Sequence, residues 1–190
     1  MNVYDFDGTI YDGDSAIDFY FFCLKRHPLI IRKLPRQFLG FFKYKLKKVT
    51  KEKFKEDFYS YFKCLKNIDE EVKVFWNRKN KKIKKWYLEQ KTKNDLIISA
   101  SPEFFLKPIC HKLNINLLAS RVNKKNGKYE SLNCYGEEKV LRFKNSYRDK
   151  IINNFYTDSK SDFPLVKISK KAFLVEKNKI IDWPYNDYEK

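Results

Sequence analysis

The stretch that decides the fold stands at the start of the chain and reads Asn2-Val-Tyr-Asp-Phe-Asp-Gly-Thr9. Residues 2–7 predict a short strand, and Gly8 follows at a natural place for a tight turn. Two carboxylates, Asp5 and Asp7, therefore stand at the carboxyl end of the strand. Ligands bind at that end in open α/β sheets, so this stretch predicts a fold class and also where its site lies.

From about residue 94 the chain alternates between strand and helix patterns. Residues 95–99 form a short apolar run typical of a buried parallel strand. Ser101-Pro-Glu103 then predicts a helix start with Ser101 as its N-cap. Residues 117–129 surround Asn126-Gly127 and predict a β-hairpin flap. The later predictions are a helix from Gly136, a strand over 151–156, a helix opening at Pro164, and strands at 173–175 and 180–181.

The residues between these two regions have a different pattern. Apolar side chains recur at helical spacing, as at Phe54, Phe58, Tyr61 and Leu65, and strand punctuation is nearly absent. We therefore predict an α/β protein with a Rossmann-like core and a mostly parallel sheet. Residues 1–13 and 90–190 would form this core, and residues 14–89 would form an all-helical cap inserted after the first strand.

The composition indicates a folded, strongly basic chain. It has 190 residues, 43% of them hydrophobic, and a formal net charge of +17. Such a charge attracts anionic partners, namely a phosphorylated substrate, an anionic membrane surface or a nucleic acid. Only seven of the 41 basic residues are Arg, however, so a general bias toward Lys is an equally good explanation.

Cysteine usage and hydropathy indicate a cytoplasmic protein. The four cysteines form no CxxC pair, which suggests a reducing compartment and mostly buried thiols. Asp5 and Asp7 interrupt the chain before any apolar region of a signal peptide could form. No run approaches the roughly 18 apolar residues of a membrane span.

The polar residues at the predicted strand ends form a chemically coherent set. It contains Asp5, Asp7 and Thr9 after the first strand, Ser99 after the second, Asp158 and Asp162 after a later one, and Lys139 from a helix start. Converging carboxylates repel one another unless a cation lies between them, and Mg²⁺ prefers such oxygen ligands. A Mg²⁺ site with a Lys and hydroxyl donors suits a transferring phosphoryl group.

These residues also carry a family resemblance. Asp5-Phe-Asp-Gly-Thr9 resembles the first motif of the haloacid dehalogenase superfamily, and Ser99, Lys139 and Asp158-Ser-Lys-Ser-Asp162 resemble its second, third and fourth. The four occur in order across nearly the whole chain. Asp14-Ser15, the residues 99–103 and the residues 133–139 are similar to the phosphoserine-phosphatase-like branch, which has a helical cap. Within that branch the chain is similar to the bacterial group that includes phosphatidylglycerophosphatase C.

The resemblance implies a Mg²⁺-dependent phosphomonoester phosphatase. Its catalytic residues would be Asp5, which forms an aspartyl-phosphate, Asp7, the general acid and base, and Lys139, which offsets negative charge. The Mg²⁺ ligands would be Asp5, the backbone carbonyl of Asp7, and Asp158. The phosphate would be bound by Gly8, Thr9, Ser99 and Ala100. Asp162 would orient metal-bound water or Lys139, and Asp14 would meet the substrate.

Several of these residues also have simpler explanations. Ser101 competes with Ser99 for the second motif, and we favour Ser99 because Ser101 is expected to cap a helix. Asp162 and Asp14 could each be only an N-cap, and Lys139 could lie on the surface, with Lys150 and Lys160 as its rivals. The family usually has Gly where this chain has Thr157, which is expected to narrow the space near the metal.

The segment from Ile30 to Lys48 leaves the substrate open. Phe38, Phe41 and Phe42, followed by Lys45, Lys47 and Lys48, resemble a basic membrane-surface helix, but we favour the simpler interpretation that the aromatics are the core of the cap and the lysines its solvated face. The first interpretation favours a phospholipid precursor such as phosphatidylglycerophosphate and a location at the inner face of the membrane. The second favours a small soluble substrate such as phosphoserine. A phosphotransferase, or a non-catalytic module that binds anionic partners, remains an alternative; nothing resembles a nucleic-acid-binding motif.

Overall fold

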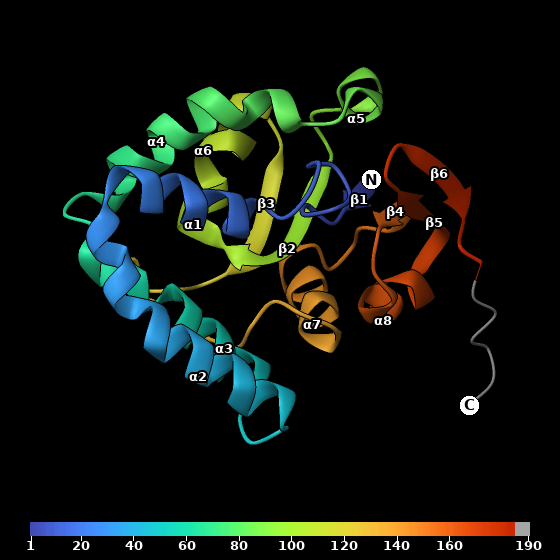
Figure 1. Cartoon of the computed structure of the whole chain (residues 1–190). Helices are drawn as coiled ribbons and strands as arrows, with labels where there is room; N and C mark the ends of the chain where they lie inside the picture. The colour runs from blue at the N-terminus through green and yellow to red at the C-terminus, as the bar shows by residue number, and fades with distance from the viewer. Residues whose placement is uncertain (185–190) are drawn as a thin grey trace.

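Figure 1 shows the computed structural model, which describes residues 1–184. Six strands form one sheet in the order β3-β2-β1-β4-β5-β6, and only β6 runs antiparallel to its neighbour. The strands are β1 (Asn2–Tyr4), β2 (Leu96–Pro102), β3 (Asn116–Ser120), β4 (Ile152–Thr157), β5 (Ser169–Glu176) and β6 (Lys179–Asp182). The predicted α/β fold with a mostly parallel sheet is confirmed, while residues 185–190 of the predicted core lie outside the described residues.

The first strand is shorter than predicted, because it ends at Tyr4 and not at residue 7. The chain turns away from the sheet where the N–H groups of Ile10 and Tyr11 both donate to the carbonyl of Phe6. The amide of Asp5 still donates to the carbonyl of Tyr156 at 2.9 Å. Asp5 is therefore the last residue of this segment held directly by the sheet.

Helices fill the chain between β1 and β2. They are α1 (Ser15–Arg26), α2 (Leu34–Lys45), α3 (Lys51–Phe58), α4 (Ile68–Lys79) and α5 (Lys85–Gln90), with 3₁₀ segments at Pro28–Lys33, Tyr59–Cys64 and Asn80–Lys82. Asp14, Thr50 and Asn67 cap α1, α3 and α4 by accepting backbone N–H groups. In Figure 1, α1 and α4 lie beside α6 (Glu103–Leu113), whereas α2 and α3 lie side by side farther from the sheet. None of the helices in residues 1–184 has the length and apolar character needed to cross a bilayer.

The predicted hairpin flap over residues 117–129 is wrong in its first half. Residues 116–120 form β3, which pairs in parallel with β2, so that Leu117 lies beside Ile97. The turn itself exists, because the N–H of Asn123 donates to the carbonyl of Lys128 at 2.8 Å. The two arms beside this turn form a single antiparallel bridge, between Val122 and Tyr129, rather than a longer strand pair. The apolar run that we assigned to the hairpin is used instead as the edge of the main sheet.

Each face of the sheet packs against its own hydrophobic cluster. Val3 and Phe155 point to the side covered by α7 (Glu137–Ser146) and α8 (Phe163–Lys167). Tyr4 and Tyr156 point to the other side, in one cluster with residues of α1, α4 and α6. Successive residues alternate between the faces, as the strand pleat requires. The carboxyl ends of β1, β2 and β4 are thereby fixed beside one another.

Candidate active site

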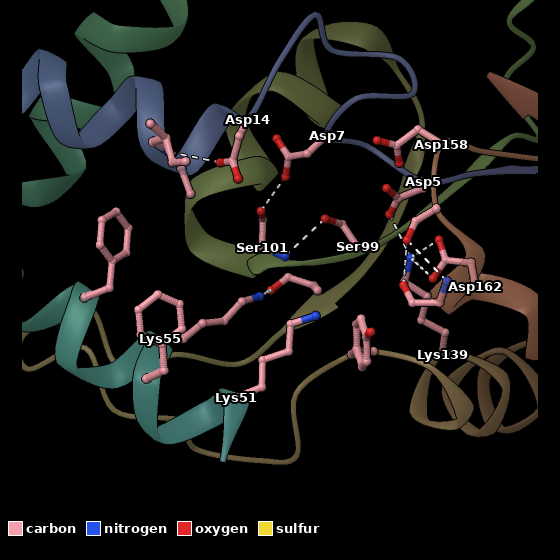
Figure 2. A pocket seen from close by; sticks show the side chains of 18 of the residues that line it. Asp5, Asp7, Asp14, Lys51, Lys55, Ser99, Ser101, Lys139, Asp158 and Asp162 are labelled. Carbon is pink, nitrogen blue, oxygen red and sulfur yellow. Dashed lines mark hydrogen bonds and ion pairs between the residues drawn. The ribbon is translucent and has the colours of Figure 1, made fainter. Parts of the chain in front are cut away.

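A cavity of about 390 Å³ opens at the carboxyl ends of β1, β2 and β4. Figure 2 shows how side chains from the sheet and from the helical segment meet around it. Eight of the predicted site residues line it: Asp5, Asp7, Asp14, Ser99, Ala100, Lys139, Asp158 and Asp162. The remaining two, Gly8 and Thr9, are not among the lining residues. Four segments far apart in the sequence therefore contribute to one cavity.

Lys139 lies between two carboxylates at the base of this cavity. Its Nζ donates to Asp5 Oδ1 at 2.7 Å and to Asp162 Oδ2 at 2.8 Å, and its side chain is only 2% exposed. Burial alone would lower the pKa of Lys139, but Asp162 and Asp5 outweigh that effect and raise it. Lys139 is therefore a buried cation bonded to the predicted nucleophile, and the surface interpretation is wrong.

Asp162 holds Lys139 and is not a helix cap. Its side chain makes no capping hydrogen bond at the start of α8. It accepts instead from Lys139 and from the hydroxyl of Thr157, the latter at 2.8 Å. Thr157, where the family usually has Gly, thus turns its hydroxyl toward Asp162. Thr157 is fully buried at the end of its strand, and Asp162 provides the hydrogen-bond partner that its buried hydroxyl needs.

Asp7 has its own set of partners, separate from those of Asp5. Its Oδ1 accepts from the Ser15 amide at 2.7 Å, and its Oδ2 accepts from the Ser101 hydroxyl at 2.6 Å. Burial, and next the neighbouring charge of Asp14, raise the pKa of Asp7 to about 6, although the two hydrogen bonds oppose this shift. A carboxyl group of that pKa can donate and accept a proton near neutral pH.

The structure corrects our prediction for Ser101. It is not an N-cap, because β2 continues through Pro102 and α6 begins at Glu103 with no side-chain cap. Ser101 bonds to Asp7, while the hydroxyl of Ser99 accepts the Ser101 amide at 3.1 Å. Our preference for Ser99 over Ser101 rested on that cap. Both hydroxyls line the cavity, and each has a different role in it.

The predicted phosphate-binding residues differ in how freely they can reach a phosphoryl group in the cavity. The hydroxyl of Thr9 is completely buried and has no hydrogen-bond partner within residues 1–184. The carbonyl of Ala100 already accepts from Lys55 at 3.0 Å and from Ser120 at 3.2 Å. Ser99 and the backbone amide of Ala100 are therefore the better candidates to bind phosphoryl oxygens. Asp14 both caps α1, through the Ile17 amide, and lines the cavity.

The carboxylates at this site fit Mg²⁺. Burial first raises the pKa of Asp5, to about 7 in spite of Lys139, and burial also raises the pKa of the more exposed Asp158. A cation between them would relieve the cost of both charges. Across the described residues, no three His, Cys, Asp or Glu side chains form a metal-binding group. Mg²⁺ needs only one or two carboxylates, since it keeps several waters. Asp5, Asp158 and the Asp7 carbonyl would hold it.

Gly8 leaves the space that Asp158 occupies. A Cβ at Gly8 would lie 1.9 Å from Asp158 Oδ2, and the backbone has a φ of +73°. We expect Gly8→Ala to displace Asp158 and to weaken Mg²⁺ binding, measured by calorimetry, and to reduce the free energy of unfolding by more than the ~1–2 kcal/mol of an unfavourable φ. Gly13→Ala is the matched control, because its φ is +100° but its Cβ would meet only Lys82 Nζ at 3.4 Å. Equal effects of the two changes would contradict this assignment.

Three lysines near the site were missed in the sequence. Lys84 is buried and donates to the carbonyls of Gly8, at 2.5 Å, and Lys177, which ties the first-motif turn to the β5–β6 turn. Lys51 and Lys55 line the cavity from α3. Nothing in the local sequence distinguishes Lys84 in a chain so rich in Lys. For Lys51 and Lys55 the one available signal was their spacing of four residues, which places them on one face of a helix.

Comparison with known proteins identifies the family of this chain. The family model described as haloacid dehalogenase-like hydrolase matches residues 3–167, and the chain belongs to this family. A protein of unknown function from Bordetella pertussis Tohama I is similar at a TM-score of 0.73 and 17% identity, covering 90% of this chain and 87% of that one. A phosphoserine phosphohydrolase-like protein from Francisella tularensis subsp. tularensis SCHU S4 has a TM-score of 0.55 and 16% identity, with 90% and 86% covered. Curated protein sequences gave no match.

At these identities the structural similarity establishes the fold alone. The chain is thus a hydrolase-family member whose fold is shared with a phosphoserine phosphohydrolase-like protein. The finer resemblance to the group of phosphatidylglycerophosphatase C stays a prediction.

Proposed function

We propose that this protein is a Mg²⁺-dependent phosphomonoester phosphatase that acts through a phosphorylated Asp5. The observation that carries the proposal is the pairing of two differently held carboxyl groups in one cavity. Asp5 is bonded to Lys139, whereas Asp7 is bonded to Ser15 and Ser101. Such a division suits one nucleophile and one general acid and base.

The reaction follows from these positions. Lys139 holds Oδ1 of Asp5, so Oδ2 is the oxygen that attacks phosphorus. The bond from phosphorus to the leaving alcohol breaks as Asp7 gives that alcohol its proton. Asp7 then takes a proton from a water molecule, which attacks phosphorus. The bond to Asp5 breaks, and inorganic phosphate and a free carboxylate are the products.

The other residues manage charge during these steps. Lys139 stabilises the negative charge shared by Asp5 and the phosphoryl group, and Asp162 keeps its ammonium in place. The hydroxyl of Ser99 donates to a phosphoryl oxygen. Bound Mg²⁺ would supply charge neutralisation for the phosphoryl oxygens. The helical segment covers the cavity with Phe54, Phe58 and Tyr59 and limits the entry of stray water.

The proposed function is tested by phosphate release from a panel of phosphomonoesters with Mg²⁺ and with chelator. We expect phosphate release when Mg²⁺ is present and none with chelator. Inorganic phosphate and the free alcohol of the substrate should remain the products when a second alcohol is added. Transfer of the phosphoryl group to that alcohol would instead make the protein a phosphotransferase. Absence of release from every ester, together with binding of an oligonucleotide at moderate salt, would favour the non-catalytic binding module.

The surface of α2 favours a substrate presented at a membrane. Phe38, Leu39, Phe42 and Leu46 are each more than half exposed, so the interpretation of these aromatics as cap core is wrong. The reason is that α2 packs on α3 through Gln37 and Gly40, where a Cβ on Gly40 would lie 2.8 Å from Asp57 Cβ. This close contact turns the apolar face outward. We name the exposed residues of 29–48 the α2 face.

The α2 face suits an anionic lipid surface better than a protein partner of mixed charge. Its large apolar residues are Leu29, Ile31, Phe38, Leu39, Phe41, Phe42 and Leu46. Its exposed basic residues are Arg32, Arg36, Lys43, Lys45, Lys47 and Lys48, and residues 29–48 contain no acidic residue. Apolar insertion with a cationic border is the pattern of helices that lie in the membrane interface. We propose that this face docks on anionic membranes and that the substrate is a phospholipid precursor, with a soluble phosphomonoester as the alternative.

We expect the protein to co-sediment with anionic vesicles at low salt and far less with zwitterionic ones. Phe38→Ser with Phe42→Ser should weaken that partitioning by roughly 10-fold or more, since two large apolar side chains would no longer be buried. The control is Leu132→Ser with Ile151→Ser, which changes two exposed apolar residues elsewhere. Absence of vesicle binding, or self-association that the Phe substitutions abolish, would contradict the membrane assignment.

A further inference from the structure

Two lysines of α3 face the active-site cavity from the helical side. Lys51 and Lys55 are four residues apart, so they lie on the same face of the helix, and both line the cavity. Figure 2 shows them reaching toward it from below, while Asp5 and Asp158 approach from the strand ends and Lys139 from α7. The mechanism proposed above uses Lys139 as its cation and assigns nothing to these two.

Neither ammonium has a carboxylate partner in the described part of the chain. Lys55 Nζ donates to the carbonyl of Ala100 at 3.0 Å, and Lys51 Nζ lies 3.4 Å from the centre of the Tyr135 ring. By contrast, Lys53 on the same helix reaches Glu56 at 3.7 Å and Asp57 at 3.6 Å. The two lysines that line the cavity are thus the ones on this helix left without an ion pair.

The environment of Lys55 makes its charge costly in the absence of a ligand. Burial, and next the charge of Lys51, lower the pKa of Lys55 to about 8. Lys139 acts in the same direction, whereas Asp7 and Asp14 oppose it. Lys55 is half-buried, and a partly desolvated cation normally has a counter-ion, because desolvation of an unpaired charge is expensive. An anion between Lys51 and Lys55 would satisfy both ammonium groups at once.

We propose that Lys51 and Lys55 form a binding site for a second anionic group on the leaving alcohol, either a carboxylate or a phosphodiester. This inference rests on the proposed phosphatase function and specifies its substrate class. The phosphoryl group itself would be matched by Lys139 and by the Mg²⁺ that Asp5 and Asp158 would hold. Phe54 and Phe58 line the same wall, so a short apolar segment fits between the two anionic groups.

Matched substrate pairs test this site and separate the two sources of the anion. Phosphoserine is compared with phosphoethanolamine, which lacks the carboxylate. The deacylated, water-soluble headgroup of phosphatidylglycerophosphate is compared with glycerol 3-phosphate, which lacks the phosphodiester. We expect kcat/KM to favour the anionic member of at least one pair, and Lys51→Gln or Lys55→Gln to reduce that preference by about 10-fold or more. The pair whose preference falls in these variants shows whether the lysines bind a carboxylate or a phosphodiester.

Lys53→Gln is the matched control, because it removes the same charge from the same helix outside the cavity. Lys55→Arg adds a readout that loss of structure would not produce. With Lys55 the KM of the anionic substrate should rise above about pH 8 as the ammonium loses its proton. With Arg, which stays protonated, that rise should disappear.

The outcomes distinguish this inference from the proposed function. Hydrolysis of all four esters with no preference within either pair would overturn the anion site and keep the phosphatase. Equal losses on both members of a pair in Lys51→Gln and Lys55→Gln would also overturn it, because the lysines would then serve the phosphoryl group. Absence of hydrolysis in the unchanged protein would reject the phosphatase itself, and with it this site.

Discussion

Asp5→Asn is expected to lower phosphate release by roughly 10³-fold or more, because an amide cannot form the bond to phosphorus that the carboxylate forms. The variant should fold as well as the unchanged protein. Burial raises the pKa of Asp5 to about 7, so its charge costs stability above that pH when no cation is bound. Removal of this charge should therefore leave the free energy of unfolding at pH 8 unchanged or higher.

Asp12→Asn provides the control for this result. Asp12 lies in the same turn region but is exposed and does not line the cavity. Full activity of Asp12→Asn with an inactive, folded Asp5→Asn would assign the chemistry to Asp5. Appreciable turnover by Asp5→Asn would mean that the nucleophile is another group.

The second large effect is expected for Lys139→Met. This change leaves Asp5 and Asp162 without the cation that both contact, and an uncompensated buried charge costs about 3–5 kcal/mol. We expect a loss of that size in the free energy of unfolding at pH 8, measured by urea denaturation, together with loss of activity. The deficit should shrink as the pH falls, because burial raises the pKa of Asp5 to about 7 and protonation of Asp5 removes one of the two unpaired charges.

A double variant separates charge from packing in this result. Adding Asp162→Asn to Lys139→Met should restore part of the lost stability and none of the activity. Lys150→Met serves as the control for loss of an exposed Lys. If Lys139→Met were as stable as the unchanged protein and remained active, the buried triad would have no role in the fold or in the chemistry.

The sequence predicted the sheet side of the site well, for a physical reason. Parallel strands end at one edge, so polar residues that follow separate strands must meet there. Asp5, Asp158 and Ser99 were found in this way, and Lys139 was found through motif order. Helix α7, which begins at Glu137, places that Lys in the core; spacing within the motif could indicate this position but not its contacts.

The helical side was predicted less well, because helical spacing shows that a face is apolar but not what covers it. We favoured the cap core for the aromatics of the α2 face, but they are exposed, because the close contact of Gly40 with Asp57 turns them outward. Ser101 was misjudged because Ser-Pro-Glu is an excellent local helix start, yet strand pairing with β3 extends β2 through Pro102. In each case a tertiary contact overrode a local preference. The boundary between cap and core remains a prediction.

The most direct test of the central claim is a trapping experiment on the phosphorylated protein. The protein is mixed with Mg²⁺ and a labelled phosphomonoester that it hydrolyses, quenched in acid within one turnover, and its modified residue is located by mass spectrometry after borohydride reduction. Before reduction we predict labelled protein that is sensitive to hydroxylamine and absent with chelator or in Asp5→Asn; reduction releases the labelled phosphate and should leave homoserine at position 5. Phosphate release without any labelled protein, or label on another residue, would contradict the account.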